Sequence, residues 1–187
     1  MDNTIINYKR AVSKWVDINQ LGNIESIEDL KQFYHRGKDY ANNWLVVQEW
    51  LYTEGLKFAD LADGTKVIFE TLREMDFSIL IISHKSIRSV KSSLDLHTPA
   101  INWLTESMSE FEFNLEDSLF LEQSRSEKIL RIKREKITHF VDDLLEVFLE
   151  PEFPKEVSSF WLTNTTTGIV PSNLKSIISL SEILNYV

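Results

Sequence analysis

The stretch Ser78-Ile-Leu-Ile-Ile-Ser83 is the strongest indication of the fold. Its four consecutive apolar residues, with a polar residue at either end, are typical of a strand buried on both faces, as in a parallel sheet. Further short apolar runs follow at 118–121, 138–141 and 158–162, separated by amphipathic segments. This alternation predicts βαβ units, and therefore an α/β fold with a parallel sheet flanked by helices.

Residues 5 to about 62 have a different pattern. Their apolar residues recur at helical spacing, with stops near Gly22 and Gly55, and the sequence Ser26-Ile-Glu-Asp29 is a capping-box-like helix start. Several aromatic side chains lie between Tyr34 and Tyr52, and we expect them to pack between helices. The first third of the chain is therefore predicted to be helical.

Composition limits the classes of function. The chain has 187 residues, 43% hydrophobic and 26% charged, which fits one domain with a modest insertion. The formal net charge of −9 argues against a nonspecific grip on nucleic acid, and the absence of cysteine excludes thiolate chemistry. No apolar run approaches the ~20 residues of a membrane span, and the N-terminus has no signal-peptide pattern. We expect a soluble, cytoplasmic protein with no nucleic-acid or membrane partner.

Polar residues that follow the apolar runs are candidates for a site, because ligands bind parallel sheets at the carboxyl ends of the strands. The hydroxyl of Ser83, with the backbone N–H groups after it, can hold a phosphate oxygen. His84 and Lys85 come next and are within reach of a substrate. The alternatives are a helix cap or turn for Ser83 and exposed loop positions for His84 and Lys85.

Two further candidates carry charge. The adjacent carboxylates of Asp142 and Asp143 repel each other unless a cation or water reaches both, and hard oxygen ligands suit Mg²⁺. Their alternative role is an N-cap and a first-turn acid for the segment 144–149. Lys128 offers a compact positive charge for phosphate, or is simply a lysine on the surface of a helix.

The order of Asp2-Asn3-Thr4, Ser83, Lys128 and Asp142-Asp143 resembles the haloacid-dehalogenase-like (HAD) superfamily. That family has an apolar strand followed by Asp-x-Asp-x-Thr, then a strand ending in Ser or Thr, then a Lys or Arg, then a strand ending in an acidic pair. The segments 52–59, 82–85 and 138–143 also resemble a bacterial subgroup of unassigned substrate. The resemblance covers nearly the whole chain.

The resemblance implies a HAD-like core with a Rossmann-like parallel sheet, formed by 1–9 and 63–187, and a helical cap at 10–62. It implies a Mg²⁺-dependent phosphatase that acts on a small phosphorylated substrate through an aspartyl-phosphate. The implied roles are catalysis by Asp2, Ser83 and Lys128, substrate binding by Thr4, Ser83, His84 and Lys128, and magnesium binding by Asp2, Asp142 and Asp143.

The first motif departs from the family pattern. If Asp2 is the second Asp of that motif, the nucleophilic Asp belongs one residue before Met1, at the end of a central strand. A truncated or misplaced start, or a catalytically inactive relative that binds phosphate or metal, explains this. A purely structural or partner-binding α/β protein is the remaining alternative.

Overall fold

The computed structural model describes residues 1–37, 39–111, 113–163 and 171–187, and the chain divides into two compact units. The α/β unit consists of Met1–Ile5, Ala62–His84 and Phe111–Val187, and the helical unit consists of Ile6–Leu61 and Lys85–Glu110. Residues 85–110 were expected in the α/β core, whereas they pack with the helices. Its helix, α5 (His97–Ser107), contacts the short 3-10 helix η1 (Glu54–Phe58) of the helical unit.

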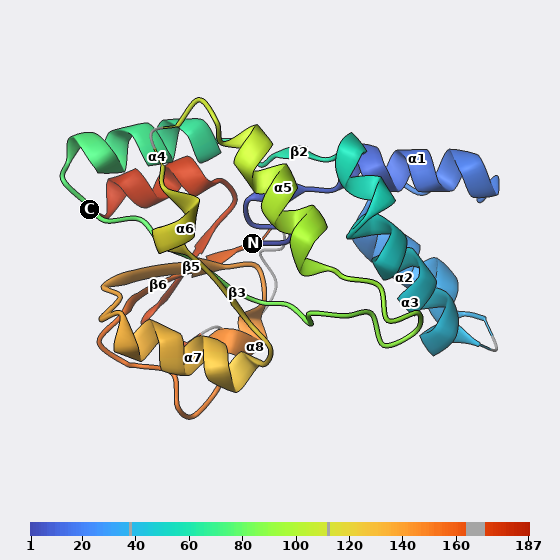
Figure 1. Cartoon of the computed structure of the whole chain (residues 1–187). Helices are drawn as coiled ribbons and strands as arrows, with labels where there is room; N and C mark the ends of the chain where they lie inside the picture. Colours follow the sequence, from blue (N-terminus) through green and yellow to red (C-terminus); the bar gives the residue numbers. More distant parts are fainter. Residues whose placement is uncertain (38, 112, 164–170) are drawn as a thin grey trace. The chain divides into compact units, whose positions relative to one another are not determined.

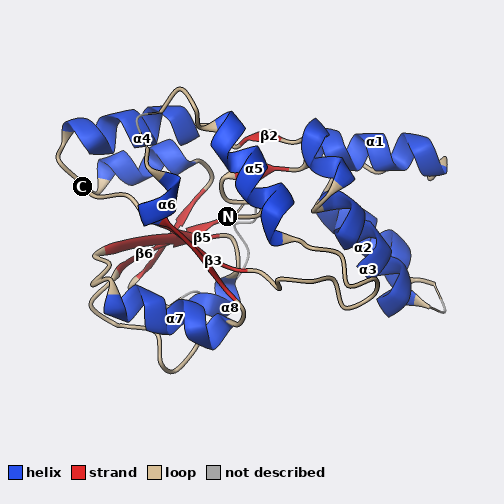
Figure 2. Ribbon diagram, viewed as in Figure 1, coloured by secondary structure: helices blue, strands red, loops and turns tan. Residues whose placement is uncertain are grey.

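The helical unit is built from the predicted helices and one short ribbon (Figure 2). Its remaining elements are β1 (Ile6–Asn7), α1 (Lys9–Asn19), α2 (Ile27–His35), α3 (Tyr40–Leu51) and β2 (Asp60–Leu61). The expected helix start at Ser26 is confirmed, because its side chain accepts the backbone N–H of Asp29 at 3.0 Å. The antiparallel pair of β1 and β2 was not expected, since two-residue strands leave no periodic pattern.

Aromatic side chains fill the space between these helices. The rings of Trp15 and Trp50 lie 5.2 Å apart, and the indole Nε1 of Trp15 donates to the hydroxyl of Tyr34 at 3.2 Å. Lys85 also belongs to this packing, because its ammonium lies 3.4 Å from the centre of the Tyr52 ring. The aromatic residues of the first third are therefore packing residues within the helical unit.

The α/β unit contains two parallel sheets. Strand β3 (Ile81–His84) pairs with β4 (Leu119–Glu122), and β5 (His139–Asp142), β6 (Ser158–Leu162) and β7 (Leu174–Ile177) form the second sheet in that order. The helices of the unit are α4 (Thr65–Glu74), α6 (Leu115–Ser118), α7 (Arg125–Arg134), α8 (Leu145–Phe148) and the 3-10 helix η2 (Leu180–Asn185). Figure 1 shows α4 and η2 on one side of the strands and α7 on the other.

Three of the four expected strands have other bounds than expected, and β4 and β5 each lie one residue later in the chain. β3 begins at Ile81, three residues late, because β4 lies only alongside Ile81–His84; Ser78 is exposed and Ile79 is half-buried. β5 extends to Asp142, so this carboxylate ends the strand and Asp143 follows it. β7 was missed because Lys175 and Ser176 interrupt its apolar pattern. The parallel α/β architecture itself is confirmed at this level.

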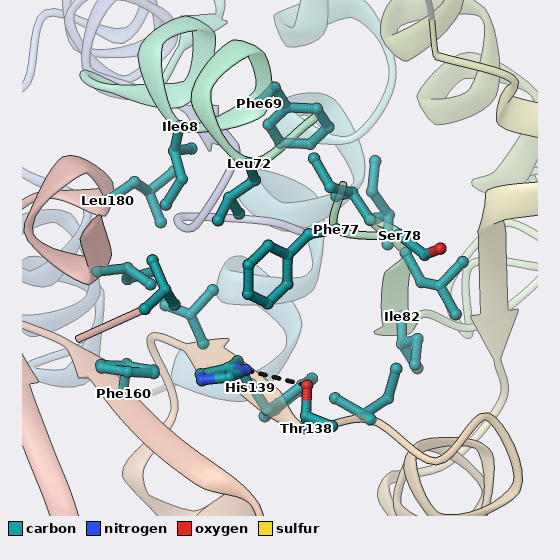
Figure 3. Close-up of a pocket in the computed structure, with 18 of the residues that line it drawn as sticks. Ile68, Phe69, Leu72, Phe77, Ser78, Ile82, Thr138, His139, Phe160 and Leu180 are labelled. Atoms are coloured by element: carbon teal, nitrogen blue, oxygen red, sulfur yellow. Dashed lines mark hydrogen bonds between the residues drawn. The ribbon is translucent and has the colours of Figure 1, made fainter. Parts of the chain in front are cut away.

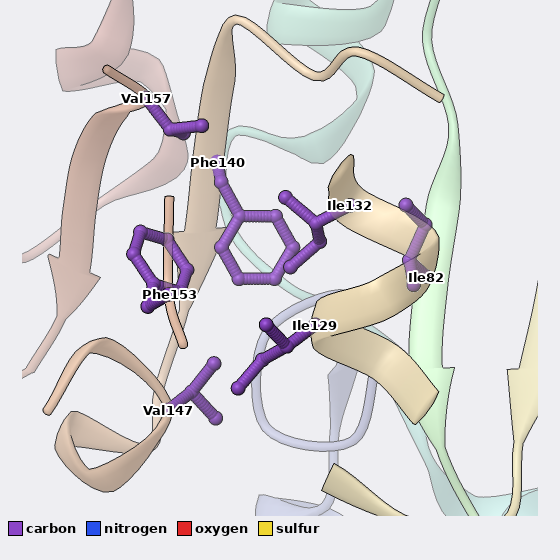
Figure 4. Packing of buried hydrophobic residues seen from close by; sticks show 7 residues of the cluster. All are labelled: Ile82, Ile129, Ile132, Phe140, Val147, Phe153 and Val157. Carbon is purple, nitrogen blue, oxygen red and sulfur yellow. The ribbon is translucent and has the colours of Figure 1, made fainter. Parts of the chain in front are cut away.

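A buried apolar cluster joins the two sheets on the α7 side (Figure 4). Ile129 and Ile132 of α7 pack against Ile82 of β3 and Phe140 of β5, so one helix spans strands from both sheets. Val147, Phe153 and Val157 complete the cluster. Within the described ranges, no helix combines the length and apolar character needed to cross a membrane.

The α7 contact supplies a stability test. Ile132 is fully buried, whereas Leu130 on the same helix is 62% exposed. Ile132→Ala should lower the free energy of unfolding by about 2–5 kcal/mol, because it removes buried methylenes and leaves a cavity. Leu130→Ala, measured in the same urea titration, should change it by no more than about 0.5 kcal/mol. Equal losses in both variants would contradict the packing of α7 described here.

Candidate functional site

The candidate site lies at the carboxyl ends of β3 and β5 in the α/β unit. Ser83 and His84 end β3, Asp142 ends β5, and Lys128 projects from the first half of α7. The N-terminal turn reaches the same place, because the side chain of Thr4 bonds to Asp143. Asn3 in this turn has a positive φ of 55°, a conformation that asparagine adopts more readily than most residues.

The centre of the site is an ion pair between Lys128 and Asp142. The Lys128 ammonium donates to Asp142 Oδ2, and each side chain is only 3% exposed. The other oxygen, Oδ1, accepts the backbone N–H of Leu144 at 2.9 Å, which forms a local turn two residues long after β5. The expected alternative of an N-cap is not found, because the N-cap of α8 is Leu144 and no side chain caps this helix. Lys128 is buried and is not a surface lysine.

Asp143 is held by the N-terminal turn. Thr4 Oγ1 donates to its Oδ1 at 3.0 Å, and Asn3 Nδ2 lies 3.4 Å from its Oδ2. Burial, with the neighbouring charge of Asp142, raises the pKa of the Asp143 carboxyl above its ordinary value, while the Met1 α-amino group and the Thr4 hydroxyl oppose that rise. Asp143 therefore holds a proton more readily than an exposed aspartate does.

The α-amino group of Met1 is a further charge in this site. Burial, with the nearby Lys128 ammonium, lowers its pKa, and the carboxylates of Asp142, Asp2 and Asp143 act in the opposite direction. The backbone carbonyl of Met1 accepts the N–H groups of Thr4 and Ile5, at 3.2 and 2.8 Å. Nothing in the sequence pattern points to this amine, because its position depends on how the N-terminal turn folds back.

Ser83 and His84 form the β3 side of the site. Ser83 is 4% exposed, which places its hydroxyl in the interior. Burial lowers the pKa of the His84 imidazole, the Lys128 ammonium lowers it further, and the Asp142 carboxylate opposes both. His84 is therefore biased toward the neutral form, in which one ring nitrogen donates and the other accepts.

Asp2, Asp142 and Asp143 are the carboxylates that were expected to bind a magnesium ion. Among the described residues, no three His, Asp or Glu side chains are placed to share a metal ion, so Asp2, Asp142 and Asp143 form no cluster of that kind. Mg²⁺ often binds through one or two carboxylates together with water and phosphate oxygens. Asp142 and Asp143 are adjacent carboxylates of that kind, but Asp142 is engaged by Lys128 and the N–H of Leu144. Asp143 is engaged by Thr4 and Asn3, so a metal at this pair would have to displace some of these contacts.

Most of the residues expected in the site belong to one unit. The α/β unit contains Asp2, Thr4, Ser83, His84, Lys128, Asp142 and Asp143. Thr4, expected to bind substrate, donates to Asp143, and Lys85 belongs to the helical unit. Trp161 was not expected here; its Nε1 donates to the backbone carbonyl of Asp143 at 3.0 Å, and a strand-interior tryptophan carries no sequence signal for that contact.

No protein-family model matches the chain, and no curated protein is significantly similar to it. Membership of the HAD superfamily therefore stays a prediction from the four short motifs.

The buried ion pair should be sensitive to loss of either partner. Lys128→Met should lower the free energy of unfolding by about 3–5 kcal/mol, because it leaves the Asp142 carboxylate buried without a counter-charge. Lys133→Met is the matched control on the same helix, since its partner Glu152 is exposed, and it should cost less than about 1 kcal/mol. Adding Asp142→Asn to Lys128→Met should cost less than the sum of the two single changes in a urea-denaturation cycle.

The lowered pKa of His84 predicts a direction of pH dependence. Below its ordinary value of 6.5, the unfolded chain binds the imidazole proton more readily than the folded chain does. The free energy of unfolding should therefore rise with pH in the window just below 6.5 and level off above it. His84→Gln should reduce this rise in urea titrations between about pH 5 and 7. An unchanged slope would rule out His84 as a contributor.

Proposed function

We propose that this chain supplies the phosphate- and magnesium-binding residues of a HAD-type phosphatase that hydrolyses a phosphoric monoester. The observation that supports the proposal is the buried Lys128–Asp142 pair at the carboxyl ends of parallel strands, with Ser83 and His84 at the same edge. A lysine ammonium held in the interior is a strong anchor for a phosphate dianion, because little water screens it.

Three side chains are proposed to bind the phosphate. The ammonium of Lys128 offsets the negative charge of the phosphate and is shared between it and Asp142. The hydroxyl of Ser83 donates to a second phosphate oxygen, and neutral His84 offers a ring N–H. These donors are fixed by β3 and α7 before the ligand arrives, so little free energy is lost in ordering them.

The Asp142–Asp143 pair is the proposed position of Mg²⁺, with the Asp2 backbone carbonyl as a further oxygen. When bound, the ion neutralises negative charge on the phosphate during the transfer. Without a cation, burial and mutual repulsion favour a proton on Asp143. Thr4 holds the Asp143 carboxylate in place through its hydroxyl and is a positioning residue for the metal site.

Catalysis requires an attacking carboxylate, and the resemblance places it one residue ahead of Met1. That carboxylate oxygen forms a bond to phosphorus while the bond from phosphorus to the substrate oxygen breaks. Asp2 gives its proton to the departing oxygen and then takes a proton from the water that hydrolyses the aspartyl-phosphate. The helical unit is proposed as the cap that selects the substrate.

A second candidate function is phosphate or metal binding without turnover. It is favoured by the direct contact of Lys128 with Asp142, because the ammonium already neutralises a carboxylate that a metal would use. The two candidates share their ligands and differ only in hydrolysis.

The binding residues can be tested on the chain of 187 residues. Mg²⁺ together with orthophosphate should raise its melting temperature, because a ligand that binds only the folded state stabilises it. Lys128→Met and Ser83→Ala should each weaken phosphate binding at least about tenfold in calorimetry, whereas Lys133→Met should leave it unchanged. If Lys128→Met binds orthophosphate like the parent chain, Lys128 is not the phosphate anchor, and phosphate binding at this site fails in both candidate functions.

Turnover separates the two candidates. An added N-terminal strand ending in Asp should give hydrolysis of an aryl phosphate with Mg²⁺, and Asp142→Asn should reduce the rate at least about 100-fold. The same extension ending in Asn is the control. Binding without hydrolysis in the Asp-extended chain would favour the second candidate.

A further inference from the structure

Arg125 is a second basic side chain at the edge where the phosphate site is proposed. It is the first residue of α7, which follows β4, so it lies at the carboxyl ends of the strands. Residues three apart on a helix share a face. From that face Lys128 reaches Asp142 at the end of β5, and Arg125 reaches Glu150 beyond α8. Arg125 is therefore one helical turn from the proposed phosphate anchor.

One donor of the Arg125 guanidinium lacks an acceptor. Nη1 donates to Glu150 Oε1 at 2.9 Å, and these two side chains are 38% and 36% exposed. Nε is buried and has no hydrogen-bond partner among the residues that the structure describes. A buried N–H without an acceptor is unfavourable, and few polar groups in folded proteins are left in this state. An oxyanion that reaches this edge of the guanidinium would remove that cost.

The bond between Arg125 and Glu150 is one that a ligand can replace. An ion pair between half-exposed side chains contributes little to stability, because water screens it and both side chains lose rotamer freedom. A guanidinium that turns away from Glu150 presents Nε and Nη2 as a planar fork for two oxygens of an anion. The site is within its electrostatic reach: burial and Lys128 lower the pKa of His84, and Arg125 lowers it further.

The α/β unit contains another space near the strands, but its lining does not suit an anion. A cavity of about 370 Å³ lies between the helices and the strands, and Phe77 points into it (Figure 3). One side is lined by apolar residues of α4, namely Ile68, Phe69 and Leu72. Burying an anionic group among such side chains is unfavourable. A second anionic group on a substrate is therefore better placed beside Arg125 than in the cavity.

We infer that Arg125 binds a second anionic group of the substrate, so that the site selects phosphoric monoesters with a further phosphate or carboxylate group close to the ester. This inference rests on the proposed function, because it takes Lys128 as the anchor of the first phosphate. Glu150 holds the guanidinium while the site is empty and releases it to the ligand. Since residues three apart on a helix lie ~5–6 Å apart, only a few bonds separate the two anionic groups.

Three probes test the second group by calorimetry on the chain of 187 residues with Mg²⁺. Orthophosphate has one anionic group, methylenediphosphonate adds a second phosphonate, and phosphonoacetate adds a carboxylate. Arg125→Gln should weaken binding of at least one two-group probe about tenfold or more, and binding of orthophosphate no more than about threefold. The probe with the larger loss shows whether the second group is a phosphate or a carboxylate. Each variant is compared with the parent on the same probe, so that chelation of Mg²⁺ cancels.

A purely structural role for the Arg125–Glu150 pair predicts a different result. Glu150→Gln frees the guanidinium and removes a competing carboxylate, so it should strengthen binding of the same probe about twofold or more. Arg125→Lys keeps the charge without the planar fork and should restore only part of the affinity that Arg125→Gln loses. Arg134→Gln, at the exposed last residue of α7, is the control and should change no affinity.

The failures of the two proposals are distinguishable. The inference alone is overturned if orthophosphate binds through Lys128 but Arg125→Gln weakens all three probes equally, or none of them. It is also overturned if Glu150→Gln weakens the two-group probes as Arg125→Gln does, since the pair would then only hold α7 in place. Absence of orthophosphate binding in the parent chain overturns the proposed function and this inference with it. If Arg125→Gln does not melt cooperatively, Arg125→Lys decides by the same selective loss.

Discussion

The buried ion pair between Lys128 and Asp142 is the interaction on which the site depends. Neither charge can lie in the interior alone, so the pair fixes α7 against the carboxyl end of β5. On the same helix, Ile129 and Ile132 point toward the apolar cluster that packs against both sheets. Two interactions therefore fix the position of α7. One is the ion pair at the strand ends, the other is apolar packing along the strands, and both favour the same position. This agreement places an ammonium group in the interior at the edge where Ser83 and His84 end β3.

The sheets illustrate how far packing can compensate for missing backbone pairing. β3 and β5 belong to different sheets, yet Ile82 and Phe140 touch the same helix. Side-chain burial on the α7 side holds the strands in one layer, while the opposite side, beneath α4 and η2, retains a cavity. The missing backbone pairing also explains why β3 begins only at Ile81. Ile79 and Leu80 lie along the cavity and have no pairing partner in β4. An apolar run predicts a buried strand correctly but cannot show on which side a neighbour is present.

The sequence predicted those helices and strands that depend on the types and spacing of neighbouring residues. The apolar run before Ser83, the basic amphipathic helix carrying Lys128 and the strand before Asp143 were each readable from residue type and spacing, and their boundaries were right to within a few residues. The rest depends on contacts between distant residues. Thr4 and Asp143 are 139 positions apart, so their hydrogen bond has no sequence signal. Lys85 follows His84 directly but packs on Tyr52 in the helical unit, because the chain passes from one unit to the other between these two residues.

Met1 links the cavity to the site, since it lines the former and contributes its α-amino group to the latter. A peptide bond at that nitrogen would replace an ionisable amine by a neutral amide. The carboxylates of Asp2, Asp142 and Asp143 would then face the Lys128 ammonium without the protonated fraction of this amine, and the site would become more negative. A more negative site binds a divalent cation more strongly and raises the pKa of Asp143 further if no cation is present. The covalent state of the Met1 nitrogen therefore acts on the charge of the acidic pair directly, without any movement of the strands that carry it.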